Sequence, residues 1–120
     1  MIASERAIRD RLRQGQITPD EALALVETEL ATAETSSLLV LRGILTLVSE
    51  RPSLTLQDAR ASFERAIELA PEDAEAYEEL AHFFNAVEPD REKAEQFYRL
   101  ALARGAGTAC QDALDELLAE

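Results

Sequence analysis

The chain has 120 residues, 47% of them hydrophobic, a size at which one domain can bury roughly two thirds of the surface that its unfolded form exposes. Its 12 Lys and Arg residues against 24 Asp and Glu residues give a net charge of −12, which repels nucleic acid and anionic lipid surfaces. The composition therefore predicts a single domain over residues 1–120 that binds neither nucleic acid nor membrane.

The residue types favour helices over strands. The chain has 4 Gly, 4 Pro and no Trp, and it is rich in residues such as Ala, Leu, Glu and Arg, which lose little rotamer freedom in a helix. Its most apolar stretch, residues 38–48, is interrupted by Arg42 and is too short to span a bilayer. Charged residues occupy the N-terminal segment, where a secretory signal would be apolar, and the single cysteine, Cys110, is compatible with a reducing compartment. We therefore expect an all-α, cytoplasmic protein.

Helix-start signals in chain order divide the sequence into seven helices. Thr18 followed by Pro19, and then Thr55, Asp90 and Thr108, are residues that can cap the first turn of a helix. With the Gly and Pro breaks between them, these signals predict helices at residues 3–14, 18–32, 36–50, 56–70, 73–86, 91–104 and 109–119. Short connections then make neighbouring helices antiparallel, which gives three hairpins and a final single helix.

Small and aromatic residues recur at helical spacing in the fourth and sixth predicted helices. The pattern small, aromatic, small occurs at i, i+4 and i+7 as Ala59, Phe63 and Ala66, and again 35 residues later as Ala94, Tyr98 and Ala101. One face of the fifth predicted helix similarly carries Tyr77, Leu80, Ala81 and Phe84. An aromatic side chain beside alanines on one face lets a neighbouring helix approach closely, so these faces are predicted to pack hairpin on hairpin.

These spacings resemble the tetratricopeptide repeat, a helix–turn–helix unit of about 34 residues. The residues that match one unit are Tyr77, Leu80, Ala81, Phe84, Ala94, Tyr98 and Ala101, and those that match the preceding unit are Gly43, Ala59, Phe63, Ala66 and Pro71. The resemblance implies a right-handed α-solenoid with repeats at 36–71 and 72–107, a divergent hairpin at 1–35 and a capping helix at 108–120. A generic helical bundle is the alternative.

The chain departs from the family pattern in two intervals and at one terminus. The intervals from Gly43 to Ala59 and from Ala81 to Ala94 are longer than in the family by four residues and one, so longer turns are expected within both hairpins, the first around residues 50–55. A glycine on each side of Ala106 replaces the closing proline.

Residues that could perform catalysis are few. The chain has one histidine, His82, and one cysteine, Cys110, on helices that another helix is expected to separate. Neither a glycine-rich phosphate loop nor metal-ligand spacing is found in the sequence. We therefore expect no enzyme activity, no metal and no cofactor.

The resemblance instead implies a protein-interaction module. In the family, the first helices of successive units line a concave groove that holds a peptide or helix. The corresponding positions here are Ser37, Val40, Ile44, Leu47, Glu75, Glu78, His82 and Asn85. The first four are mostly apolar and the last four acidic and polar, so the expected partner is a protein or peptide with basic residues and an apolar anchor. The Lys and Asn ladder that clamps a C-terminal carboxylate in some family members is missing.

Two alternatives remain open at this point. Val40, Ile44 and Leu47 belong either to the groove or to a core covered by the first hairpin. The chain is alternatively a self-assembling scaffold that forms a homodimer. The dimer would form through an uncovered end or through the first helix, which is basic because it has four arginines and only two acidic residues.

Overall fold

Residues 5–120, the part of the chain that the computed structural model describes, form seven α-helices and one π-helical turn, without a strand. The helices are α1 (Glu5–Arg13), α2 (Pro19–Thr32), α3 (Ser36–Val48), α4 (Leu56–Leu69), α5 (Ala74–His82), α6 (Arg91–Ala103) and α7 (Thr108–Ala119), and the π-helical turn η1 (Phe83–Val87) continues α5. The all-α prediction is confirmed for this range. Residues 3 and 4, predicted to start the first helix, lie outside it.

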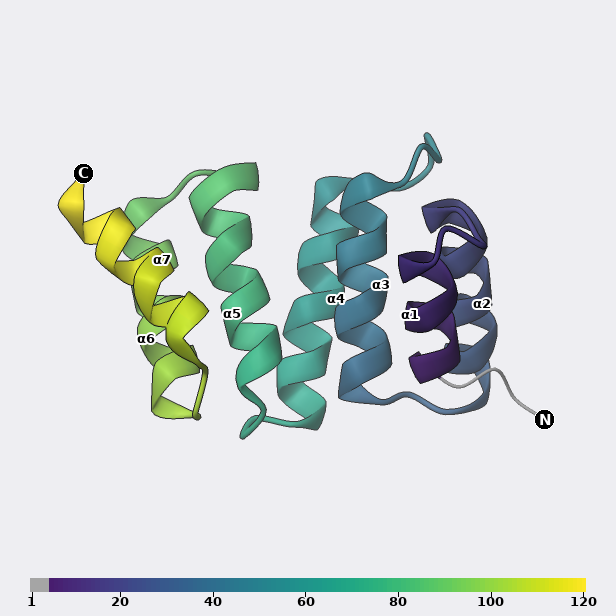
Figure 1. Cartoon of the computed structure of the whole chain (residues 1–120), viewed down its shortest axis with the longest axis horizontal. Helices are drawn as coiled ribbons and strands as arrows, with labels where there is room; N and C mark the ends of the chain where they lie inside the picture. Colours follow the sequence, from purple (N-terminus) through teal and green to yellow (C-terminus); the bar gives the residue numbers. More distant parts are fainter. Residues whose placement is uncertain (1–4) are drawn as a thin grey trace.

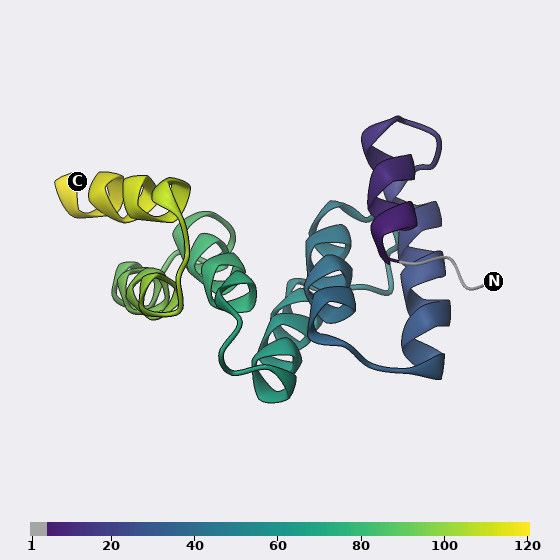
Figure 2. The same cartoon turned by 60° about the horizontal axis from the view of Figure 1, so that its bottom comes forward.

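The helices form a row along the long axis of a molecule of 45 × 29 × 26 Å, with α1 and α2 at one end, then α3, α4 and α5, and α6 and α7 at the other end (Figure 1). Each helix packs against the next one, most extensively α3 against α4 and α5 against α6, and α3 also contacts α5. Figure 2 shows α1 beside α2 at one end of this row and α7 beside α6 at the other, with α1 and α7 both on the side opposite α4. No helix within the described range has the length and apolar character needed to cross a bilayer.

Side-chain caps start most of the helices. Thr18 and Thr55 each form a capping box with the acidic residue three positions later, and the Asp90 carboxylate accepts a hydrogen bond from the Lys93 amide at 3.1 Å, as predicted. The prediction for Thr108 is wrong. Gly107 is the N-cap of α7 and gives no side-chain hydrogen bond, so Thr108 is the first helical residue.

The predicted aromatic and small residues form the centre of the core. All six residues of the two triplets are buried with 0% exposure: Ala59, Phe63, Ala66, Ala94, Tyr98 and Ala101. They belong to a cluster that runs from α3 to α7, and a second cluster joins α1 and α2 to the other side of α3 through residues such as Ile8, Leu23 and Leu41. Helix α3 is therefore buried on both sides, which explains its nearly continuous apolar sequence.

The two long intervals are accommodated differently. Residues 49–55 form the long turn expected after α3, and this turn is attached to α2, because Ser49 Oγ donates to Asp20 Oδ1 at 2.6 Å and Arg51 Nη2 lies 2.7 Å from Glu27 Oε1. The longer turn expected before α6 is not found there, since only residues 88–90 separate η1 from α6. The extra residue is held in η1, where the Glu88 amide donates to the Phe83 carbonyl five residues earlier at 2.9 Å.

Gly43 marks the closest approach between two helices. A Cβ atom at this position would lie 2.4 Å from Cε1 of Phe63 and 2.8 Å from its Cδ1, well inside contact distance. The aromatic ring of α4 therefore packs directly on the backbone of α3, which explains why this position lacks a side chain.

Gly43→Ala should destabilise the protein by about 1–3 kcal/mol, because the added methyl group forces the buried Phe63 ring or the α3 backbone to move. The free energy of unfolding from urea denaturation is the measurement. The control repeats the alanine substitution in a Phe63→Leu background. Because leucine is smaller than phenylalanine, the difference in unfolding free energy between Phe63→Leu and the double variant Gly43→Ala, Phe63→Leu should be much smaller than the cost of Gly43→Ala alone. An equal alanine cost with phenylalanine and with leucine would contradict the contact.

Candidate functional site

The eight predicted binding residues lie on two helices that contact each other. Four are on α3, namely Ser37, Val40, Ile44 and Leu47; three are on α5, namely Glu75, Glu78 and His82; and Asn85 is in η1. Because α3 packs against α5, the fold brings the apolar and the polar set next to each other. We refer to this surface as the α3–α5 face.

Val40 must be removed from the predicted set. It is only 1% exposed and belongs to the cluster that runs from α3 to α7, so a partner cannot reach it. Ile44 and Leu47 pack against the same cluster but are only partly buried. Of the two alternatives that the sequence leaves open, groove or core, Val40 is therefore core, in the cluster against which Leu30 of α2 also packs.

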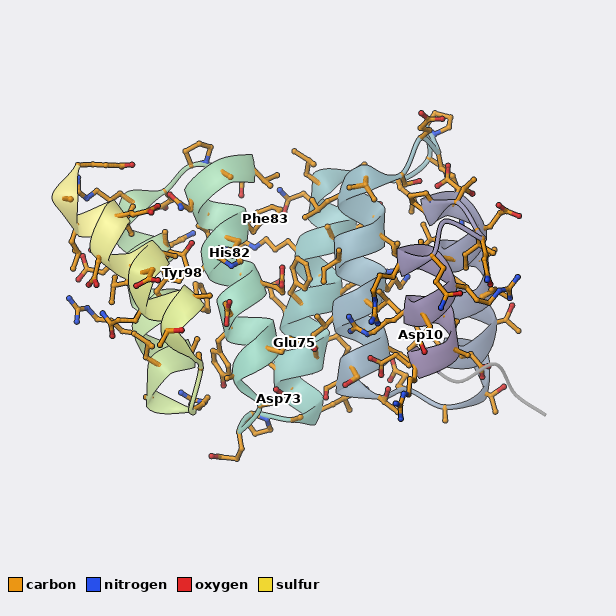
Figure 3. The ribbon with its side chains drawn as sticks, in the orientation of Figure 1. Asp10, Asp73, Glu75, His82, Phe83 and Tyr98 are labelled. Carbon is orange, nitrogen blue, oxygen red and sulfur yellow. The ribbon has the colours of Figure 1, made fainter. Side chains whose placement is uncertain are left out.

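Polar side chains of α5, η1 and α6 meet at the hydroxyl of Tyr98. His82 Nδ1 lies 2.7 Å from Tyr98 Oη, and Asn85 Nδ2 donates to the same oxygen at 3.3 Å. On the other side of the imidazole ring, His82 Nε2 lies 3.5 Å from Glu78 Oε2. Figure 3 shows His82 near the end of α5 with Tyr98 beside it.

The hydrogen-bond inventory assigns the proton positions of this group. Tyr98 is buried, and its hydroxyl hydrogen needs an acceptor. The Asn85 amide nitrogen can only donate, so the hydroxyl donates to His82 Nδ1, and neutral His82 carries its hydrogen on Nε2, toward Glu78. Burial raises the pKa of the Tyr98 hydroxyl, so Tyr98 stays protonated and donates in this arrangement.

Three carboxylates extend the site along α5. Glu75 and Glu79 are one helical turn apart, and Glu78 lies next to Glu79. Burial raises the pKa of Glu79, and the neighbouring carboxylates of Glu75 and Glu78 add to this effect. Burial likewise raises the pKa of Glu75, although Arg9 opposes the shift. We call Glu75, Glu78 and Glu79 the acidic row.

Helix α1 supplies a cation to the acidic row. Arg9 Nη2 lies 3.9 Å from Glu75 Oε1, and Arg9 Nε donates to Glu5 Oε2 at 2.8 Å. Another arginine of α1, Arg13, is paired with Asp10 at 2.8 Å. Part of the positive charge of α1 is therefore compensated within the chain.

Sequence reasoning missed Arg9, Glu79 and Tyr98 as members of this site. Glu79 could have been included, because it lies one helical turn after Glu75. Tyr98 was assigned to the core by its spacing, correctly, but the spacing does not indicate where its hydroxyl points. No local pattern relates Arg9 to Glu75, because their contact depends on how the helices pack.

Two surface clefts lie away from the α3–α5 face. One, of about 340 Å³, lies between α1 and α2 and is lined by Arg11, Ile17, Glu21, Ala24, Leu25 and Thr28. The other, of about 290 Å³, is lined by Thr18, Pro19, Asp20, Val48 and Glu50. Neither cleft is lined by a predicted binding residue.

The second residue considered for catalysis, Cys110, lies on the far side of Tyr98. Its thiol donates to the main-chain oxygen of Tyr98 at 3.7 Å, and burial raises the pKa of the thiol. A raised pKa lowers the thiolate fraction on which cysteine nucleophilicity depends. The described contacts of the thiol are therefore with α6 and not with His82.

Comparison with known proteins gives no family. The chain matches none of the models of known protein families, and no curated protein matches it in sequence.

Glu79→Gln should stabilise the protein at neutral pH. Because the pKa of Glu79 is raised above its ordinary value of 4.5 in the folded state, the folded protein holds this proton more tightly than the unfolded chain. Stability therefore falls as the pH rises from the ordinary value through the raised pKa, and glutamine removes that loss. The difference in melting temperature between the variant and the native protein should be positive at pH 7 and shrink in acid.

Glu116→Gln on the exposed side of α7 is the control, because it removes the same formal charge away from the acidic row. If both variants gave the same stabilisation at every pH, the effect would come from net charge and not from burial of Glu79.

Proposed function

We propose that the protein is a non-catalytic interaction module, a right-handed α-solenoid of three antiparallel helical hairpins and a capping helix, related to the tetratricopeptide repeat family. Support comes from the order of the helices along the long axis and from the complete burial of both small–aromatic–small triplets. In such a solenoid α3 and α5 are the first helices of successive repeats. The α3–α5 face would then be its binding groove.

The observation that carries the binding proposal is the acidic row on α5 together with the partly exposed apolar side chains on α3, the helix that α5 contacts. Glu75, Glu78 and Glu79 lie on α5, and the helix that α5 contacts contributes Ile44 and Leu47. Like charges one helical turn apart repel each other, and a cation from a partner relieves this repulsion. The partner that fits is a peptide or helix of another protein that combines basic residues with an apolar anchor.

The pairing of Arg9 with Glu75 supports this choice of partner. The Arg9 guanidinium lies 3.9 Å from the Glu75 carboxylate, although its closer partner is Glu5. The row therefore accepts an arginine side chain sterically, while only one of its three carboxylates has such a partner among the described residues.

Non-catalytic character is part of the proposal. The arrangement of Glu78, His82 and Tyr98 resembles a carboxylate–imidazole–hydroxyl relay, but its hydroxyl group belongs to a residue with 0% exposure and a raised pKa. A substrate cannot reach that oxygen in this structure. We also propose a cytoplasmic location, for which the single, buried, unpaired Cys110 is the support.

Replacing two carboxylates of the acidic row should weaken binding of a basic partner by about tenfold, which corresponds to about 1.4 kcal/mol. The variant is Glu75→Gln with Glu78→Gln, and the matched control is Glu64→Gln with Glu95→Gln, which removes two carboxylates from α4 and α6. Native protein and both variants serve as baits in affinity capture from a lysate of the source cells, and the retained protein is then titrated calorimetrically at two salt concentrations.

A partner kept by the native and control baits and lost with the acidic-row variant supports the proposal. Equal retention by all three baits would place the binding surface elsewhere on the molecule.

The proposal also predicts a monomer. The alternative homodimer through α1 needs free cations there, and two of the four arginines, Arg9 and Arg13, already pair with carboxylates of the chain. Light scattering coupled to size exclusion should give about 13 kDa at every concentration tested, in agreement with the chain mass of 13.2 kDa. A mass that rises toward twice this value with concentration would favour the self-assembling scaffold.

A further inference from the structure

The group formed by His82, Tyr98 and Asn85 links a surface histidine to a surface amide through one buried hydroxyl. The His82 and Asn85 side chains lie on the proposed groove, whereas Tyr98 is buried with 0% exposure. Tyr98 Oη has one hydrogen and two lone pairs, and in the neutral state it donates to His82 Nδ1 and accepts from Asn85 Nδ2. Asn85 is an exposed residue of the π-helical turn, and its carbonyl oxygen Oδ1 therefore points away from Tyr98.

Protonation of His82 reverses the direction of this chain of hydrogen bonds. A doubly protonated imidazole has no acceptor, so Nδ1 then donates to Tyr98 Oη, and the tyrosine hydrogen loses its acceptor. The nearest replacement is the other end of the Asn85 side chain, because rotation of the amide by half a turn brings Oδ1 to the position of Nδ2, 3.3 Å from Tyr98 Oη. A buried hydroxyl without an acceptor is unfavourable, which drives this rotation.

We propose that the protonation state of His82 sets the orientation of the Asn85 amide, so that this part of the surface changes from accepting to donating hydrogen bonds in acid. With neutral His82, Asn85 presents its oxygen outward. With protonated His82, Asn85 presents its NH₂ group, and the histidine adds a positive charge. Both changes make the surface less favourable for a basic partner, and this consequence rests on the proposed function.

The titratable and charged groups that face His82 come from several helices. Helix α5 contributes Glu78, at 3.5 Å from Nε2, and Glu79, which interacts electrostatically with the imidazole. Helix α6 contributes Tyr98, behind which lies the Cys110 thiol of α7. Arg9 of α1 acts on Glu79 from the opposite side of the row. His82 is the only histidine of the chain, so its titration is observed without overlap.

His82 and Asn85 are three residues apart, a spacing that places two side chains on the same face of a helix. Asn85 thereby reaches the same tyrosine oxygen as His82 while remaining exposed.

The test is an NMR titration of the isotope-labelled full chain, and it needs no partner. The His82 Cε1 proton reports protonation, and the two side-chain amide protons of Asn85 report the hydrogen bond to Tyr98. We expect the Asn85 amide signals to shift with the same midpoint as His82 between about pH 5 and 8, the range in which histidine ordinarily titrates. Asn85 signals that stay constant while His82 titrates would overturn the proposal.

Variants separate the coupling from a simple charge effect. In Tyr98→Phe, His82 should still titrate, but the Asn85 side chain should no longer follow it. In Asn85→Ala, an exposed position at which folding is not at risk, the midpoint of His82 should fall, because protonation then leaves the Tyr98 hydroxyl without the Asn85 oxygen as its acceptor. Gln96→Ala, which removes an exposed amide from α6, should leave the midpoint unchanged.

An unchanged His82 midpoint in Asn85→Ala would also overturn the proposal, and this result is available even if Tyr98→Phe does not fold. None of these outcomes depends on the binding experiment, so a failed partner search and a failed coupling are distinguished.

Discussion

The burial of Tyr98 is the constraint on which the site depends. Its ring lies in the core between the alanines of its own helix, so its position is fixed by packing, and its hydroxyl is carried to the boundary of that core. A buried hydroxyl requires hydrogen-bond partners, and the residues that supply them, His82 and Asn85, lie at the junction between α5 and the π-helical turn. The same side chain thus joins the packing of α6 to the polar surface of α5.

The sequence predicts the helices and the core because both depend on local patterns. Capping residues such as Thr18 and Thr55 form their predicted hydrogen bonds within three residues, and the burial of Phe63 and Tyr98 follows from helical periodicity. Thr108 fails as a cap because Gly107 before it takes that position. A capping pattern shows that a residue is able to cap, but the path of the chain decides which residue does.

The features that the sequence does not predict depend on contacts between distant elements or on backbone geometry. The interval from Ala81 to Ala94 is one residue longer than in the family pattern. The extra residue can lengthen a turn or can be inserted into a helix as a π-helical turn, and the residue types do not show which of the two occurs. Val40 lies on the predicted face of α3, but the cluster running to α7 covers it. The ion pair between Arg9 and Glu75 joins the first and the fifth helix, which no periodicity relates. The contact of Arg9 and the direction of the Tyr98 hydroxyl were therefore beyond sequence reasoning, whereas the residues of α5 were not.

The acidic row is unfavourable for the stability of the folded chain, and this supports the proposed binding function. Ionised Glu79 is partly buried beside two other carboxylates, and burial and charge repulsion both raise its pKa, so the folded protein loses stability by keeping it ionised at neutral pH. Arg9 offsets this only in part, because its shorter contact is to Glu5 and not to Glu75. Elsewhere, at Arg51 and Glu27 or at Arg65 and Glu34, the chain places opposite charges within 3 Å. A half-buried set of like charges on one helix is unfavourable for folding, and this supports the proposal that a partner supplies the counter-charge.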